Sequence, residues 1–301
     1  MKYALVQESR IGARKVNQDR IGHWSSPETL LFAVADGLGG HAHGEVAAQV
    51  AIDLLGRVFA HEARPKLANP EQFLPRAMAA AHVAIMREAE ARRLRDAPRT
   101  VLVACLVQEG RAFWAHIGDS RLYLLRKGRI HARTRDHSWV QHLVDEGRIR
   151  EEAVSSHPER NRLLQCLGGL QAPRVDTGGE RLEKDDIVLL CSDGLWGPLT
   201  QRQIVNALLT QPLEPAIGSL LELSAARAGN EADNTSVVAL RWDEEKLIEH
   251  DGPATVPYAD LPTDVQDFTA TDMDFLRMSD EDVEKAIADI KAALRKAPQQ
   301  R

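Results

Sequence analysis

The chain has 301 residues, of which 44% are hydrophobic and 27% charged, ordinary values for a globular protein with a substantial core. Its apolar stretches are too short to span a membrane, and its N-terminus lacks the apolar core of a signal peptide. We therefore expect no membrane-spanning segment and no signal peptide. Three widely spaced cysteines, Cys105, Cys166 and Cys191, argue against a disulfide framework and predict a cytoplasmic location.

The net charge of −6 belongs to the C-terminal part of the chain. Residues 245–301 contain 13 acidic and 7 basic side chains, whereas residues 1–244 contain 31 of each. The body therefore has no basic excess of the kind that binds nucleic acid. We expect no nucleic-acid or membrane partner, and a monomer.

Strand-like and helical patterns alternate along the body without the regular rhythm of a doubly wound fold. This order favours an α+β fold, in which a central β-sandwich of two antiparallel sheets is flanked by helices. In chain order we expect three strands, two helices, three strands, a short helix, a strand, two helices and a last strand, at residues 3–7, 18–24, 30–35, 44–59, 70–95, 100–107, 111–117, 121–126, 138–146, 187–191, 201–210, 214–228 and 235–242.

Residues 1–244 are predicted to form one domain, and the composition changes after it. Residues 245–278 are acidic and contain prolines without periodicity, which predicts a linker. Residues 279–297 predict an amphipathic helix, because Ser279 can cap it and apolar side chains then follow at helical spacing. This helix either folds back on the body or docks a partner.

Four aspartates stand at the ends of apolar runs that read as strands. Asp36 and Asp193 end such runs and precede glycines, Asp119 follows the run at 112–117, and Asp233 opens the last run. Any one of them alone could be a turn residue. Together at one rim they would repel one another unless a cation lay among them, and Mg²⁺ and Mn²⁺ prefer oxygen ligands.

Two further segments add to this pattern. The stretch from Gly12 to Asp19 supplies Arg14 and a fifth carboxylate. Arginine can bind a phosphate through two parallel hydrogen bonds, although a lone arginine near an aspartate is more often a surface pair. The glycines after Asp36 let the backbone approach an ion closely, so the Gly37 carbonyl is a candidate ligand.

These motifs resemble the metal-dependent protein serine/threonine phosphatases, the PPM or type 2C class, in their bacterial form. The resemblance covers about residues 3–242. The matching elements, in the family's order, are Arg14-x-x-Asn17-Gln18-Asp19, Asp36-Gly-x-Gly-Gly-His-x-x-Gly-Glu45, Gly118-Asp119-Ser120-Arg121-x-Tyr123, Asp136-His137-Ser138, Ser192-Asp193-Gly194-Leu195 and Asp233-Asn234-Thr235-Ser236.

The resemblance implies two Mn²⁺ or Mg²⁺ ions at one end of the sandwich. By the family's pattern Asp36 bridges the ions and the Gly37 carbonyl binds the first. Asp193 and Asp233 hold the second, and Asp19 acts through metal-bound water. A third, looser ion would fall on Asp119 and Asp193. Arg14 would bind the substrate phosphate, and the family's mobile flap would correspond to residues 146–161.

The implied reaction is hydrolysis of phosphoserine and phosphothreonine in proteins, opposing bacterial serine/threonine kinases. The partners would be a cognate kinase and its phosphorylated substrates. Two metal ions can activate a water and offset phosphoryl charge, so no side-chain nucleophile is needed. A silent phosphoprotein-sensing or docking domain is the alternative, disfavoured because all five aspartates are present. A phosphodiesterase or nuclease is disfavoured by the neutral body.

The general acid is an open question. Leu38 stands where eukaryotic relatives have a histidine that is thought to protonate the leaving group. His41, His43 or metal-bound water could take this role. Either histidine could instead cap the loop before the helix at 44–59.

Two other positions depart from the family's pattern. The small Gly-Thr-Thr element appears here as Arg99-Thr100-Val101, so we expect different local packing. Gly12 and Arg14 are separated by one residue where relatives often have two, although Arg14 keeps its spacing to Asp19.

Overall fold

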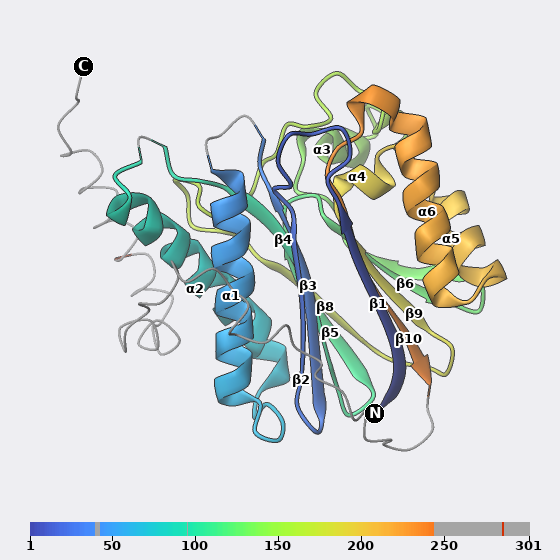
Figure 1. Ribbon diagram of the computed structural model, residues 1–301, viewed down its shortest axis with the longest axis horizontal. Helices are drawn as coiled ribbons and strands as arrows, with labels where there is room; N and C mark the ends of the chain where they lie inside the picture. Colours follow the sequence, from blue (N-terminus) through green and yellow to red (C-terminus); the bar gives the residue numbers. More distant parts are fainter. Residues whose placement is uncertain (40–42, 95, 244–284, 286–301) are drawn as a thin grey trace.

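Two five-stranded antiparallel sheets lie face to face, with helices on both outer surfaces (Figure 1). The computed structural model describes residues 1–39, 43–94, 96–243 and 285. The strand order is β1-β10-β9-β6-β7 in the first sheet and β2-β3-β4-β5-β8 in the second. The predicted α+β sandwich is therefore confirmed.

The elements follow the chain order that the sequence predicts, with additions. The strands are β1 Lys2–Arg10, β2 Arg20–Ser25, β3 Thr29–Gly37, β4 Thr100–Gln108, β5 Arg111–Ile117, β6 Arg121–Arg126, β7 Arg129–Arg133, β8 Asp176–Arg181, β9 Ile187–Cys191 and β10 Thr235–Asp243. The helices are α1 Gly44–Glu62, α2 Pro70–Ala91, α3 Trp139–Asp145, α4 Asp193–Trp196, α5 Gln201–Thr210 and α6 Leu213–Ala228, with short 3-10 turns η1 Glu151–Ala153 and η2 Gly229–Glu231.

The central strands are buried on both faces, which explains why they read as continuous apolar runs. In β3, Phe32 and Val34 belong to the core between the sheets. Leu31 and Ala33 belong to the core beneath α1 and α2. A second helical layer, α5 and α6, covers the other sheet around residues such as Leu189, so the sandwich has four layers (Figure 1).

Helix α2 begins where the sequence predicts but ends four residues earlier. Asn69 caps its first turn by accepting a hydrogen bond from the Gln72 backbone, and Pro70 occupies the first helical position. At the other end, Arg92 is the C-cap and Arg93 adopts a φ of 52°. A left-handed residue cannot continue a helix, so the predicted extension to residue 95 is wrong.

Strands β7 and β8 form sheet edges. Strand β7 pairs with β6 across the turn at Lys127 and Gly128, and neither β7 nor β8 is among the strands that the sequence predicts. The sequence of β8 contains Gly178 and Gly179 and has no apolar alternation. A Cβ at Gly178 would lie 2.4 Å from Nε1 of Trp114 on the paired strand β5, so close packing requires glycine where strand propensity would disfavour it.

The last strand, β10, ends at Asp243, next to the predicted domain boundary at residue 244. The predicted linker at 245–278 and helix at 279–297 lie outside the described residues, apart from helical Lys285, and remain predictions. Within the described residues, no helix has the length and hydropathy that crossing a bilayer requires.

Candidate metal centre

The five predicted aspartates lie at one rim of the sandwich, where strands of both sheets begin or end. Asp36 is near the end of β3, and Asp119 lies between β5 and β6. Asp193 opens α4 just after β9, Asp19 directly precedes β2, and Asp233 lies two residues before the first residue of β10. The rim is the upper end of the molecule in Figure 1, beside α4. Strand ends hold these side chains on a rigid base.

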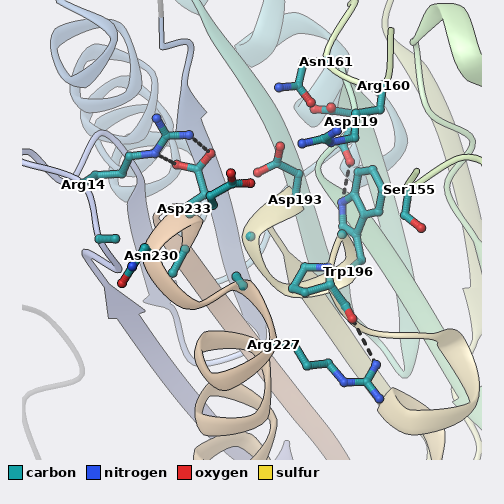
Figure 2. Close-up of a pocket in the computed structure, with 17 residues that line it drawn as sticks. Arg14, Asp119, Ser155, Arg160, Asn161, Asp193, Trp196, Arg227, Asn230 and Asp233 are labelled. Carbon is teal, nitrogen blue, oxygen red and sulfur yellow. Dashed lines mark hydrogen bonds and ion pairs between the residues drawn. The ribbon is translucent and has the colours of Figure 1, made fainter. Parts of the chain in front are cut away.

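A cavity of about 650 Å³ opens at this rim. Its wall includes Arg14, Asp119, Asp193 and Asp233, which lie around one opening in Figure 2. Arg160, from the segment predicted to be the flap, lines the same cavity. The structure therefore brings Arg14, which is predicted to bind the substrate phosphate, to the same opening as three of the predicted metal ligands.

Asp19 lies at the base of the site and is only 2% exposed. Its Oδ2 accepts a hydrogen bond of 2.8 Å from Ser192 Oγ. Its Oδ1 is buried without a hydrogen-bond partner in the described part of the chain. Burial raises the pKa of Asp19 to about 6, against the hydrogen bonds from Ser236 and Ser192. A buried carboxylate oxygen with no donor is well suited to a cation.

The neighbouring carboxyl groups also hold their protons unusually tightly. Burial, followed by repulsion from Asp19 and Asp193, raises the pKa of Asp36 well above its ordinary value. The same two causes raise the pKa of Asp193 to about 7, with Asp233 as the strongest repelling neighbour. Burial and Asp193 raise the pKa of Asp119. A divalent cation among these groups would remove the repulsion.

Arg14 forms a two-bond ion pair with Asp233. Nε lies 2.8 Å from Oδ1 and Nη2 lies 2.6 Å from Oδ2, as the dashed lines in Figure 2 indicate. The bond and charge of Asp233 raise the pKa of the Arg14 guanidinium. Both side chains are substantially exposed at the cavity mouth. Arg14 is thus positioned by one of the predicted metal ligands.

Two residues that belong to the matching motifs, but to which the sequence assigned no role, tie this rim together. Asn234 accepts from the Gln18 backbone at 2.8 Å and donates to the carbonyls of Ile11 and Val16, which joins the Arg14 loop to the start of β10. Ser192 is fully buried, and besides donating to Asp19 it accepts from the Ser236 backbone at 2.9 Å. The available signal was their position beside Asp233 and Asp193.

The turn at Asp36 and Gly37 packs directly on the start of α1. A Cβ at Gly37 would lie 2.4 Å from the Gly44 carbonyl, so only glycine fits. Thr100 Oγ1 donates to the Asp36 carbonyl at 2.7 Å, and Leu38 N donates to the Arg99 carbonyl at 2.9 Å. The altered segment beginning at Arg99 therefore still supports the Asp36 turn.

The structure describes one of the two histidines that are candidate general acids. His43 is at the N-cap of α1 with a φ of 71°, and its side chain makes no capping hydrogen bond. Its Nδ1 lies 3.7 Å from Glu45 Oε1, and the ring is exposed. His43 therefore occupies the N-cap position but does not cap the helix through its side chain. His41 lies outside the described residues.

A second polar cluster adjoins the rim. His116, His137 and Asp176 place their ligand atoms within 4.8 Å of one another, close enough to hold a metal ion. However, His137 Nδ1 accepts from Gly118 N at 3.2 Å, while its Nε2 faces Asp176 at 3.3 Å. A metal at Nε2 would need a proton on Nδ1, against the Gly118 N–H. We interpret this cluster as a hydrogen-bonded clamp on the residue before Asp119.

Comparison with known proteins identifies the family. The model of the family described as protein phosphatase 2C matches residues 6–231. The chain belongs to this family. It is 39% identical over 208 residues to the serine/threonine protein phosphatase PstP of Mycobacterium tuberculosis, a match that covers 69% of this chain and 39% of the length of PstP. The predicted family membership is therefore confirmed.

Solved structures of family members have the same fold. The crystal structure of the Mycobacterium tuberculosis phosphatase PstP/Ppp is 34% identical with a TM-score of 0.71, and the match covers 80% of this chain and 99% of that chain. A structure of the PstP catalytic domain in complex with two manganese ions is 32% identical with a TM-score of 0.68, covering 79% and 97%.

Proposed function

We propose that this chain hydrolyses phosphoserine and phosphothreonine in proteins at a centre of two Mn²⁺ or Mg²⁺ ions. The observation that carries the proposal is the convergence of five aspartates, from five separate segments, on one rim of the sandwich, where three of them line one cavity together with Arg14. One arginine cannot compensate so many carboxylates, so the site needs added positive charge. The two manganese ions bound by the PstP catalytic domain support this reading.

The donor set fits hard divalent cations. Asp36 interacts electrostatically with both Asp19 and Asp193, as suits a bridging ligand, and the Gly37 carbonyl is adjacent. Asp193 and Asp233 would hold the second ion, and Asp19 would act through a coordinated water. Asp119 with Asp193 would hold a third, looser ion. When bound, such ions make a water nucleophilic near neutral pH and neutralise charge on phosphoryl oxygens.

The protein's own groups supply binding and orientation. Arg14 uses Nε and Nη2 for Asp233, which leaves Nη1 available for a phosphate oxygen at the cavity mouth. Such a contact would orient the phosphoryl group and offset its charge. Leu38 cannot donate a proton, so His41 and His43 remain the side-chain candidates for protonating the leaving group. The three cysteines are free, which supports a cytoplasmic setting.

The natural substrates in this proposal are phosphorylated proteins, with a bacterial serine/threonine kinase acting in the opposite direction. The test uses the full-length chain with Mn²⁺, offered a phosphothreonine peptide and a nucleotide diester side by side, with and without a chelator. We expect cleavage of the peptide alone, abolished by chelation. Preferential diester cleavage, or no cleavage of the phosphopeptide at any Mn²⁺ concentration, would overturn the proposal.

A further inference from the structure

A second cavity, of about 420 Å³, adjoins the first. Asn161 lines both cavities, so the two lie next to each other. The second cavity begins directly after the Asp36 turn, and its wall includes Leu38, Gly39, Arg99, Leu164 and Leu170. A polypeptide whose phosphorylated side chain entered the first cavity would have its neighbouring residues beside the second.

Arg99 is a cation in this wall that pairs with no carboxylate of the described residues. Its Nε is buried and donates no hydrogen bond to any described residue, and the Arg99 guanidinium forms no ion pair within the described part of the chain. The positive charge of Arg99 lowers the pKa of the neighbouring Cys166 thiol, against the larger effect of burial. The backbone of Arg99 is fixed by the hydrogen bond from Leu38. A planar guanidinium beside a cavity is suited to binding a carboxylate.

Two exposed leucines line the second cavity, on a segment that is held by backbone hydrogen bonds. Leu164 and Leu170 are 47% and 62% exposed, and both belong to the wall of this cavity. The segment carrying them is held by Leu164 N donating to the His137 carbonyl at 2.8 Å, and by reciprocal backbone bonds between Leu167 and Thr100. The surface is therefore formed before any ligand arrives.

We infer that the second cavity binds the stretch of substrate protein next to the phosphorylated residue, and that Arg99 binds the carboxylate of an acidic side chain there. The inference rests on the proposed function. Charge complementarity with Arg99, the exposed leucines and the position beside the first cavity all point to this occupant. Arg99 stands where the family's pattern has a small glycine, so the preference belongs to this chain and not to the family in general.

The first test is a peptide series with full-length enzyme and Mn²⁺. Glutamate or glutamine is placed at each of four positions on either side of phosphothreonine, a span of about 13 Å in each direction. At one or two adjacent positions we expect glutamate to raise kcat/KM about tenfold over glutamine, as one charge-assisted hydrogen bond would. In Arg99→Gln this ratio should fall to about one, and in Arg99→Glu lysine should become the preferred residue.

Arg202→Gln is the matched control, because Arg202 is exposed on α5, and it should keep the wild-type ratio. Hydrolysis of all peptides without a glutamate effect, or a glutamate effect that survives Arg99→Gln, would overturn this inference while leaving the proposed function intact. Failure to hydrolyse any peptide would instead contradict the proposed function. A second phosphate that surpassed glutamate in an Arg99-dependent way would overturn the assignment to a carboxylate.

A second variant tests the exposed leucines at the rim of the second cavity independently of Arg99. Leu170→Ser alters a largely exposed side chain, and Leu223→Ser, on α6 and 38% exposed, is its control. With peptides that carry leucine or asparagine beside phosphothreonine, we expect the leucine preference in kcat/KM to fall at least about threefold in Leu170→Ser alone. Equal preferences in both variants would show that the rim does not contact substrate.

Discussion

Two groups of buried charges lie at the same rim of the sandwich and are compensated in opposite ways. Arg121 and Asp136 form a closed pair, with bonds of 2.8 and 2.7 Å and side chains 5% and 1% exposed. Arg121 also stacks on Trp196, 3.6 Å from its ring centroid. The group around Asp36 instead collects five carboxylates with Arg14 as the cation paired to one of them.

The difference distinguishes a structural ion pair from a group of carboxylates that is suited to binding cations. In the closed pair each charge has its partner within the chain, so removing one partner exposes the cost of burying the other. In the Asp36 group the chain itself leaves repulsion uncompensated, so removing one charge should relieve the metal-free protein. Removing a charge from the closed pair should therefore lower the stability of the protein. Removing one from the Asp36 group should raise the stability of the metal-free protein while it lowers activity.

The largest expected effect is on activity. Asp36→Asn keeps the shape of the side chain but removes the charge proposed to hold two ions. We expect phosphopeptide hydrolysis to fall at least about a thousandfold. Steady-state kinetics at saturating Mn²⁺ measure it, with Asp243→Asn, at the opposite end of β10, as the control that stays active. Near-normal turnover of Asp36→Asn would mean that the metal assignment is wrong.

Disrupting the Arg121–Asp136 pair should lower the stability of the protein. Arg121→Met leaves Asp136 buried and unpaired, so we expect the free energy of unfolding to fall by about 3 kcal/mol. Urea denaturation followed by fluorescence measures the loss. Arg92→Met removes an exposed helical pair with Glu88 and should cost at most about 0.5 kcal/mol. Equal losses in the two variants would argue that burial of the Arg121 pair has no special consequence.

Arg14→Ala should act on substrate binding. Because Arg14 sits at the cavity mouth and not among the predicted metal ligands, we expect kcat/KM to fall about tenfold to a hundredfold, mainly through a higher KM. Mn²⁺ affinity, measured by calorimetry, should hold or rise, since Asp233 loses a competing partner. Arg10→Ala, which removes an exposed pair with Glu8, is the control. A collapse of Mn²⁺ binding in Arg14→Ala would show that the arginine organises the ligands.

The smallest effect concerns the metal-free protein. The pKa of Asp193 is about 7 in the folded state, above the ordinary value of about 3.9 expected on unfolding. A raised carboxyl pKa means that folded stability declines as pH rises from about 4 through 7. In chelator, Asp193→Asn should therefore be more stable than wild type at pH 8, by at least about 1 kcal/mol, and this gain should shrink toward pH 4.

Asp145→Asn is the control for this pH dependence. Hydrogen bonds from Arg135 and Gln141 lower the pKa of Asp145 against a desolvation effect, so the substitution should destabilise the protein at pH 8. Thermal unfolding across the pH range measures both variants. A gain for Asp193→Asn that did not depend on pH would show that ionisation of this carboxyl group is not the cause.

The sequence predicted the parts of this molecule that are encoded locally. Asp36 and Asp193 could be found because a β-strand ends next to each, and β3 could be found from its apolar run. Strand β8 could not, because the close packing of Gly178 on Trp114 becomes visible only when the strands are paired. The premature end of α2 likewise depends on the backbone at Arg93.

Contacts between distant segments were also beyond the sequence. The Arg14 loop and Asp233 are joined across 219 positions of the chain, and Ser192 reaches Asp19 across 173. Local patterns place each residue near a rim but do not state which side chains meet there. The contacts of His137 with Gly118 and Asp176 similarly depend on how three separate segments of the chain come together. Neither the positions nor the spacing of the histidines in the sequence could reveal them.

The most direct test of the central claim is Mn²⁺ binding to the full-length protein, followed by electron paramagnetic resonance of the free ion. The proposed centre predicts at least two bound ions per chain in wild type, with binding lost in Asp36→Asn and retained in Arg14→Ala. Activity should rise with occupancy of these sites. Full phosphopeptide hydrolysis by thoroughly chelated protein, or unchanged Mn²⁺ binding in Asp36→Asn, would contradict a metal centre built on these aspartates.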